Sequence, residues 1–323
     1  MPKSEETFIQ RQLKKIAIEK KEIEQIESIE KEICNEVKSW SSLKLIFLNY
    51  VADIYSKIMG SDKSIFKDKH YFIDLFSGSG IGKVIDSQDD IILGSPLMVA
   101  TQNKNKFTKM FFCDINTDYI NALKSRLNFL NFSDDNFNVF PECCNKAIDK
   151  IIPMVKGAHS LIFIDPYGME ITWKSMEKLL SLDADIIMNF QTVEIPRAKQ
   201  NEGIPPTMEN FFKDKNEVKK IYETYIGRDI RESLLEMYKK DMVDAKLKHF
   251  SGAIIGSVRI KKDDRFYYDL IFLTKQTSKG NPWLKPIIDA GDELEKLNAN
   301  IVQEVLSILK GRQKTLLSWL KIF

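Results

Sequence analysis

Tyr71-Phe-Ile-Asp-Leu-Phe-Ser-Gly-Ser-Gly-Ile-Gly-Lys83 is the stretch that decides the fold. Residues 71–74 have strand character and lead directly into a glycine-rich turn. Because Gly78, Gly80 and Gly82 carry no Cβ, the backbone there can turn tightly with positive φ and lie close to a ligand. A strand that ends in such a turn, at the edge of a parallel sheet, typically binds a nucleotide-like ligand.

The spacing of the glycines indicates which ligand is bound. A dinucleotide fingerprint needs its third glycine at position 83, which is Lys83, and the G-K-[ST] of a P-loop is absent. The pattern is instead Asp-x-Phe-x-Gly-x-Gly, with Asp74, Phe76, Gly78 and Gly80 at its fixed positions. An acidic strand end suits a cation, and S-adenosylmethionine carries both a sulfonium and an ammonium group. The stretch resembles motif I of class I S-adenosylmethionine-dependent methyltransferases; a glycine turn of another α/β protein is the alternative.

The composition is that of an ordinary globular protein. The chain has 323 residues, of which 43% are hydrophobic and 29% charged, and a formal net charge of +2 that neither demands nor excludes nucleic acid. With three His and no C-x-x-C pair, it offers no metal-binding pattern, and we expect free thiols at Cys34, Cys113, Cys143 and Cys144. Since no signal-peptide core and no apolar run of membrane-spanning length occurs, we expect a cytoplasmic protein without membrane segments.

The N-terminal residues 5–38 are predicted to form one long polar helix. Isoleucine and valine recur along it at intervals of three, four and seven, at Ile16, Ile23, Ile26, Ile33 and Val37. Such a narrow stripe is typical of a coiled-coil seam, which would make a homodimer or hold a partner protein. A helix folded onto its own domain is an equally open interpretation.

A second, more apolar helix is expected over residues 43–58, capped by Ser41 or Ser42. Trp40 and Lys44 stand four residues apart at its start. They resemble the Trp-x-x-x-Lys of amino-methyltransferases of the Dam type, in which the lysine contacts the cofactor. A packing tryptophan and a solvated lysine are the simpler interpretation.

From Tyr71 onward, strands and helices alternate as in a parallel α/β sheet, and Ser95 is predicted to cap a helix. The next strand, residues 109–114, ends in Asp114, whose carboxylate can accept hydrogen bonds from ribose hydroxyls. Methyltransferases usually place an acidic residue after the third strand to bind the adenine amino group. Here Cys143 takes that position, with Glu142 one residue earlier, so the resemblance leaves adenine recognition open.

Asp165-Pro-Tyr-Gly168 follows an apolar run that predicts a central strand buried on both faces. It resembles the Asp-Pro-Pro-Tyr motif of methyltransferases that modify exocyclic amines of bases, with one proline missing. An aryl amine is a poor nucleophile because its lone pair is delocalised. Asp165 and the carbonyl of Pro166 can each accept one N–H of the amine and free the lone pair, while Tyr167 offers a stacking face. A structural Asp-Pro turn is the alternative.

Residues 252–260 and 265–275 predict a hairpin around the turn 261–264. An antiparallel last strand completes the seven-stranded, mostly parallel sheet of the Rossmann-like class I methyltransferase fold, whereas an NAD-dependent oxidoreductase would continue with parallel strands. We expect a helical segment at 1–66, a methyltransferase-like domain at 67–275 with a helical insertion at 196–248, and C-terminal helices at 276–323.

Together these motifs, between Trp40 and Pro286, resemble the family of three-Cys-motif partner proteins. The resemblance implies a methyltransferase that works with a radical-SAM-like iron–sulfur protein carrying the three-Cys motif. It implies cofactor contacts at Asp74, Phe76, Gly78, Gly80, Asp114, Cys143 and Lys44, and a catalytic role for Asp165, Pro166 and Tyr167. The amine chemistry favours a nucleic-acid base as the substrate and leaves DNA, RNA and a small molecule open. A catalytically weak scaffold protein is the alternative.

Overall fold

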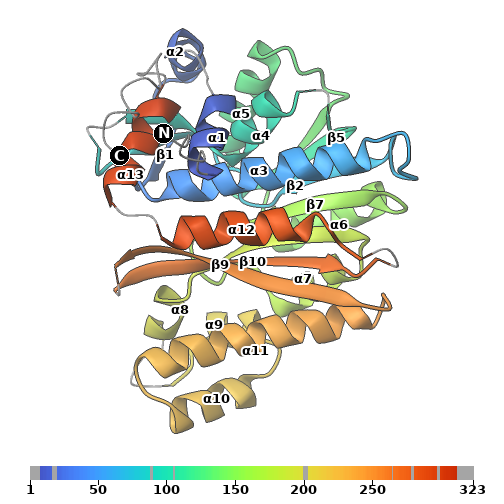
Figure 1. Cartoon of the computed structure of the whole chain (residues 1–323), viewed down its shortest axis with the longest axis vertical. Helices are drawn as coiled ribbons and strands as arrows, with labels where there is room; N and C mark the ends of the chain where they lie inside the picture. The colour runs from blue at the N-terminus through green and yellow to red at the C-terminus, as the bar shows by residue number, and fades with distance from the viewer. Residues whose placement is uncertain are drawn as a thin grey trace, which may run out of the picture.

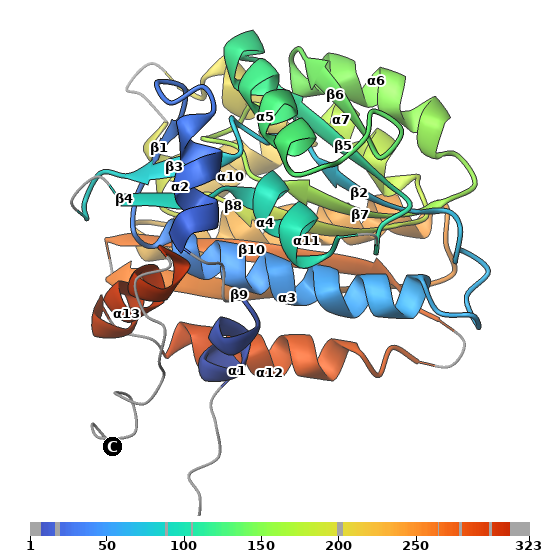
Figure 2. The same ribbon diagram turned by 90° about the horizontal axis from the view of Figure 1, so that it is seen from above.

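A twisted seven-stranded sheet runs through the middle of the molecule (Figures 1 and 2). The computed structural model describes residues 8–16, 20–87, 90–104, 106–198, 203–263, 265–277, 280–296 and 299–310. The strands of this sheet are β2 (His70–Asp74), β5 (Lys109–Asp114), β6 (Phe137–Pro141), β7 (His159–Ile164), β8 (Ala184–Phe190), β9 (Ala253–Asp263) and β10 (Phe266–Lys275). The first five pair in parallel, and β10 is antiparallel to both of its neighbours.

The strand order is β6-β5-β2-β7-β8-β10-β9. Numbered along the chain within this sheet, the order reads 3-2-1-4-5-7-6, with the seventh strand inserted antiparallel. This is the sheet of class I methyltransferases, so the predicted fold class is confirmed. The antiparallel β10 separates it from a dinucleotide-binding Rossmann sheet, in which the sixth strand continues in the same direction.

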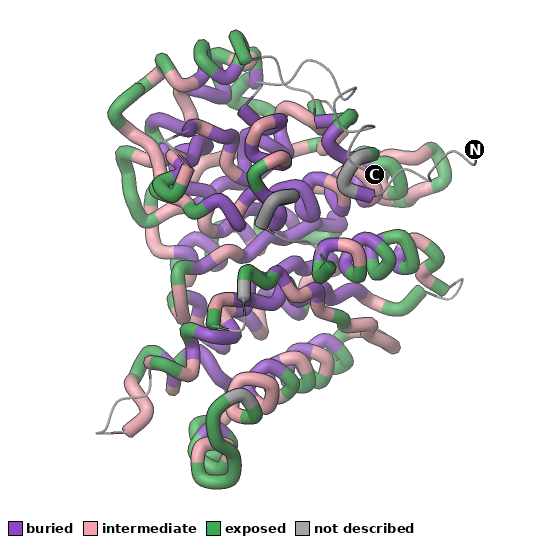
Figure 3. Tube along the Cα trace, turned by 60° about the vertical axis from the view of Figure 1, so that its left-hand side comes forward, coloured by how far each residue is buried: buried purple, intermediate pink, exposed green. Residues whose placement is uncertain are grey.

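Helices cover both faces of the sheet and bury two separate hydrophobic clusters. One face carries α3 (Ser41–Met59), α4 (Ser95–Gln102), α5 (Thr117–Phe129) and α12 (Leu284–Glu295). The other carries α6 (Cys144–Val155), α7 (Trp173–Leu180), α9 (Pro206–Phe211), α10 (Lys215–Thr224) and α11 (Arg228–Leu247). Figure 3 shows the buried residues concentrated in the middle and the exposed ones on the outer helices. Because the helices fill both faces, a ligand has access mainly at the ends of the strands.

The prediction of one long N-terminal helix is wrong. The segment forms α1 (Phe8–Lys15) and α2 (Lys20–Ser28), passes Glu30 with a left-handed φ of 51°, and ends in the strand β1 (Asn35–Val37). Ile16, Ile23 and Ile26, which the coiled-coil interpretation needed on an outer seam, are buried in the core of the same chain. An isolated polar helix gains little stability by itself, and burying these isoleucines favours the broken path. Dimerisation through this segment stays a prediction, although the described residues do not form the continuous helical stripe on which it was based.

A small second sheet was not predicted. Its order is β1-β3-β4, with β3 (Ile81–Val84) and β4 (Asp90–Leu93) following the glycine turn directly. The chain therefore makes a hairpin before it enters α4, and β1 pairs in parallel with β3. Gly82 lies in β3 with an ordinary φ, so only Gly78 and Gly80 use the positive φ expected of all three glycines.

The predicted helix caps are shifted by one or two residues. Ser41 and Ser42 lie inside α3, whose N-cap is Trp40, and Ser95 is the first residue of α4, whose N-cap is Gly94. The C-terminal part forms α12 and α13 (Ala299–Leu309) as expected, while the predicted apolar end at Leu316, Trp319 and Leu320 lies outside the described residues. Among the described helices, none combines the length and apolar character needed to cross a membrane.

Candidate active site

The two sequence motifs meet in one cleft at the carboxyl ends of the parallel strands. The cleft has a volume of about 710 Å³ and is lined by Gly78 and Gly80 of the glycine turn and by Asp165 and Tyr167 of the second motif. The small sheet β1-β3-β4 and the tip of the β9–β10 hairpin lie at the same end of the molecule in Figures 1 and 2. Both motifs therefore lie at one rim of the sheet and share one cleft.

The glycine turn forms a cradle that only glycine can form. Gly78 has a φ of +58° and Gly80 a φ of +87°, which L side chains rarely adopt. A Cβ on Gly80 would lie 2.8 Å from side-chain atoms of Leu97 and Leu123. The backbone N–H of Gly78 donates to Oδ2 of Asp114 over 3.0 Å, so the turn is fixed to the end of the next strand.

Asp114 lines the cleft as predicted. Its Oδ1 accepts a hydrogen bond of 2.9 Å from the backbone N–H of Asn116, and its Oδ2 accepts the one from Gly78. Burial raises the pKa of this carboxyl group. Each carboxylate oxygen has two lone pairs, so Asp114 can still accept a hydrogen bond from a hydroxyl group of a ligand in the cleft.

Asp74 lies beneath the glycine turn and does not line the cleft. Its side chain is fully buried; Oδ1 accepts from the N–H of Phe76 over 3.2 Å, and Oδ2 has no hydrogen-bond partner among the described residues. Burial raises the pKa of Asp74 to about 7. Asp74 therefore supports the glycine turn from below and has no surface in the cleft for the cation contact expected from the sequence. Phe76, in contrast, lines the cleft.

Cys143 and Glu142 do not reach the cleft. Cys143 stands at the N-cap of α6, with the side-chain amide of Asn145 3.6 Å from its Sγ. Glu142 forms an ion pair of 2.6 Å with Lys150. The adenine contact at Cys143 stays a prediction, for a residue that stands at the start of α6 and outside the lining of this cleft.

The Asp165 carboxylate is held by two side chains from other elements. Lys44 Nζ lies 2.5 Å from Asp165 Oδ2, and the amide of Asn189 donates to Oδ1 over 2.7 Å. Gln191 Nε2 donates to the carbonyl of Pro166 over 3.4 Å. The interpretation of Lys44 as solvated is wrong, since the residue is only 9% exposed.

Aromatic side chains stand at the cleft as well. Tyr167 is 75% exposed and lines the cleft together with Tyr119, Tyr268 and Phe266. Tyr268 is buried and its ring lies 5.8 Å from Lys44 Nζ. The exposure of Tyr167 fits the predicted stacking face, since a fully packed tyrosine could not offer one.

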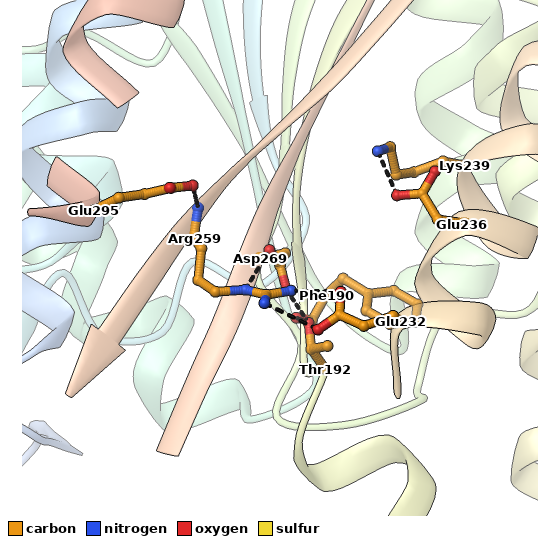
Figure 4. A network of polar contacts seen from close by, with 8 residues as sticks. All are labelled: Phe190, Thr192, Glu232, Glu236, Lys239, Arg259, Asp269 and Glu295. Atoms are coloured by element: carbon orange, nitrogen blue, oxygen red, sulfur yellow. Dashed lines mark hydrogen bonds and ion pairs between the residues drawn. The ribbon is translucent and has the colours of Figure 1, made fainter. Parts of the chain in front are cut away.

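A polar network fixes the turn that carries Gln191 (Figure 4). The hydroxyl of Thr192 donates to Asp269, and the Arg259 guanidinium donates to Asp269 over 3.1 and 3.0 Å. The same guanidinium binds both carboxylate oxygens of Glu232 on α11, at 2.9 and 3.0 Å. These contacts connect the end of β8 with β9, β10 and the helical insertion. Nothing in the sequence marked them, because charged residues of amphipathic helices are usually solvated.

The N-terminal segment supplies the part of the cleft that sequence reasoning missed. Residues 34–38 line it, although they were predicted to belong to the long N-terminal helix. Pairing of β1 with β3 places them beside the glycine turn. A three-residue strand within a polar, helix-like stretch leaves no local signal that could have revealed this.

Comparison with known proteins gives likeness in structure and no match in sequence. No family model matches this sequence, and no curated protein matches it either. Among solved structures, the O-methyltransferase TomG from Streptomyces achromogenes has a TM-score of 0.40 and 10% identity, over 71% of this chain and 79% of that one. An O-methyltransferase from Bacillus cereus has a TM-score of 0.39 and 13% identity, over 73% and 91%. Human methyltransferase-like protein 13 has a TM-score of 0.37 and 9% identity, over 77% and 90%.

Proposed function

We propose that this protein is an S-adenosylmethionine-dependent methyltransferase that modifies an exocyclic amine of a nucleic-acid base, together with an iron–sulfur partner protein of the three-Cys-motif kind. The observation that carries the proposal is the single cleft lined by both the glycine turn and the Asp165-Pro166-Tyr167 motif. A donor site and an acceptor site must share a cleft for direct transfer between two bound molecules.

The cleft fits the cofactor. Ligand sites for molecules of this size measure roughly 300–1,000 Å³, and this cleft of about 710 Å³ lies in that range. Gly78 and Gly80 leave open the space that a Cβ would fill, and Asp114 keeps lone pairs toward the cleft for ribose hydroxyls. We assign cofactor binding to Phe76, Gly78, Gly80 and Asp114. When bound, the cofactor supplies a methyl group activated by the positive sulfonium.

The acceptor side positions the amine. Asp165 and the carbonyl of Pro166 accept its two N–H groups, which localises the lone pair on nitrogen. Lys44 and Asn189 hold the Asp165 carboxylate in one orientation, since each binds a different oxygen. Tyr167 stacks on the base. Positioning of this kind supplies most of the rate enhancement and needs no strong general base.

One observation favours the second candidate, a weakly active scaffold for an iron–sulfur enzyme. Both oxygens of Asp165 and the carbonyl of Pro166 already accept hydrogen bonds from the chain's own donors, Lys44, Asn189 and Gln191. A substrate amine has to use the remaining lone pairs or replace one of these donors. A protein that never receives an amine would show the same closed arrangement.

The test has two steps. Calorimetry with S-adenosylmethionine and S-adenosylhomocysteine is expected to show micromolar binding, and a flat titration would contradict the cofactor assignment. Incubation with labelled methyl donor and total RNA or DNA, followed by nucleoside mass spectrometry, is expected to show a methylated exocyclic amine. Cofactor binding without transfer to any nucleic acid, combined with co-purification of an iron–sulfur protein, would select the scaffold.

A further inference from the structure

The side chain of Asn35, on β1, is the most closely fitted polar group next to the glycine turn. Its Oδ1 accepts a hydrogen bond of 2.7 Å from the backbone N–H of Ser79, the residue between the two cradle glycines. Three atoms of the carboxamide lie within 2.4–2.8 Å of the place where a Cβ of Gly78 would stand. The carboxamide therefore lies flat against Gly78, and the missing side chain of that glycine is what makes room for it.

The orientation of this carboxamide leaves its donor end open. With Oδ1 committed to Ser79, the Nδ2 amide group of Asn35 has no hydrogen-bond partner within the described part of the chain, although Asn35 lines the cleft. An amide NH₂ carries two donors. The cleft thus contains a fixed donor, directed by its own acceptor, that no other side chain uses.

Arg126 holds the segment that carries Asn35. This arginine of α5 is fully buried, and its guanidinium donates to the carbonyl of Ser79 over 2.6 Å. It also donates to the carbonyls of Ile29, Glu30 and Ile33, at 2.9, 3.1 and 2.8 Å. One side chain therefore ties the glycine turn to the chain that leads into β1.

Burial of this guanidinium has an electrostatic consequence. Its partners are carbonyl oxygens, no carboxylate lies within ion-pair distance of it in the described residues, and burial lowers the pKa of Arg126 to about 10. A charge that is not neutralised favours a negative group nearby. Lys38 and Glu36 of the same segment both line the cleft, so their opposite charges offset each other and Arg126 supplies the net positive charge beside the glycine turn.

We propose that Asn35 is a cofactor-binding residue whose Nδ2 donates to the α-carboxylate of the cofactor's amino-acid portion, and that Arg126 is its positioning residue. The inference rests on the proposed function. With the methyl group facing Asp165 and the ribose reaching Asp114, we place the amino-acid end at the wall formed by residues 34–38, beside the glycine turn. The open amide donor of Asn35 at this wall, with the buried Arg126 guanidinium bound only to carbonyl oxygens of the adjoining chain, suits a carboxylate.

The test compares two ligands that differ in the amino-acid portion. S-adenosylhomocysteine carries the carboxylate, whereas 5′-methylthioadenosine has the same adenosine and thioether without it. Asn35→Asp keeps the size of the side chain and an oxygen for the N–H of Ser79, and replaces the donor by a negative charge. We expect its affinity for S-adenosylhomocysteine to fall by about tenfold or more, and its affinity for 5′-methylthioadenosine to stay within about twofold.

The control variant is Asn216→Asp, which makes the same change of charge at an exposed residue of α10. It is expected to leave both affinities unchanged. Equal losses for both ligands in Asn35→Asp would overturn the inference, because they would indicate a ribose contact or a purely structural role. Wild-type protein that binds neither ligand would instead refute the proposed function, and this inference with it.

Arg126 is tested through its coupling to Asn35. Arg126→Lys keeps the charge but loses the forked contacts to four carbonyls. We therefore expect it to lower the affinity for S-adenosylhomocysteine more than the affinity for 5′-methylthioadenosine. In the Asn35→Asp background the same change should add little further discrimination between the ligands, since Arg126 acts through Asn35. Full additivity of the two changes would contradict the positioning role. The melting temperature and near-UV circular dichroism of each variant show that the fold is kept.

Discussion

The parallel strands of the central sheet all begin on one side, here called the amino edge, and end on the other, here called the carboxyl edge. Similar residue types serve different purposes at these two edges. At the amino edge, His159 contacts the hydroxyl of Tyr55 over 3.1 Å and lies 3.3 Å from a carboxylate oxygen of Asp183. Lys275 pairs with the other oxygen of Asp183 over 2.6 Å. None of these side chains lines the cleft. Their polar groups bind one another and stabilise the amino edge of the sheet.

At the carboxyl edge the polar groups also have partners, but they face an open space. Lys44, Asp165 and Asn189 all line the cleft while binding one another, and Tyr167 remains 75% exposed. The comparison teaches that a polar residue at a strand end does not by itself indicate a functional site. What distinguishes the carboxyl edge is that its hydrogen-bonding groups surround a volume large enough for a ligand.

The largest expected difference between the edges concerns chemistry. Asp165→Ala removes an acceptor for the substrate amine and should lower methyl transfer by about 100-fold or more, with the affinity for S-adenosylhomocysteine changed by less than about threefold. Single-turnover transfer and calorimetry measure the two quantities. Asp183→Ala at the amino edge is the matched variant and should lower the free energy of unfolding without slowing transfer. If Asp165→Ala lost cofactor affinity and activity in equal proportion, the two edges would both be structural.

The next effect concerns the glycine cradle. Gly80→Ala combines a φ of +87° with contacts of 2.8 Å to Leu97 and Leu123, whereas Gly157 has a φ of +78° and nothing within 4 Å of a Cβ. Strain of about 1–3 kcal/mol at Gly80 should weaken S-adenosylhomocysteine binding roughly 10- to 100-fold. Gly157→Ala has a similar backbone cost and should leave binding unchanged. Equal affinities of the two variants would show that the cradle does not hold the cofactor.

A smaller effect distinguishes the edges by pH. The folded pKa of Asp74 is about 7, above its ordinary 3.8, so its contribution to stability is full below pH 3.8 and is lost as pH rises through 7. Burial lowers the folded pKa of His159 from 6.5, so its contribution is full above pH 6.5 and is lost as pH falls through the lowered value.

Asp74→Asn should therefore gain stability relative to wild type as pH rises from about 5 to 8, by about 2 kcal/mol. His159→Gln should gain relative to wild type as pH falls below about 6.5, with a slope of at most about 1.4 kcal/mol per pH unit. Urea unfolding at several pH values measures both. If the free energy of unfolding relative to wild type changed in the same direction with pH in both variants, this distinction between the edges would be lost.

The smallest expected effect is a null result near the cleft. Cys143→Ser should change the affinity for S-adenosylhomocysteine by less than about twofold, because Cys143 caps α6 and does not line the cleft. A loss of tenfold or more would restore the adenine contact inferred from sequence, and would mean that the cleft extends further along the carboxyl edge when a ligand binds.

The parts of the fold that were predictable from the sequence depend on local signals. The strand 109–114 has the predicted bounds, because apolar runs bounded by turns specify buried strands. The shared cleft followed from two motifs at the ends of parallel strands. Asp114, Asp165 and Tyr167 were found in this way.

The parts that were missed depend on contacts between distant segments. The hydrogen bond from Ser79 to Asn35 joins residues 44 apart, and the N-terminal stretch has the composition of an ordinary polar helix. Lys44 was predicted either as a cofactor contact or as a solvated lysine, because the sequence does not show that the first turn of α3 faces Asp165. Arg126 gave no signal, since a helical arginine is usually exposed.

The tie made by Arg126 also constrains how the protein is made. The carbonyl of Ile33 lies 93 residues before the guanidinium that binds it, so the ribosome synthesises this wall of the cleft long before its anchor exists. The carbonyls of Ile29, Glu30 and Ile33 therefore cannot make these hydrogen bonds until α5 has been synthesised. A nascent chain arrested before Arg126 contains both the glycine turn and its wall, but it lacks the four hydrogen bonds that tie them together.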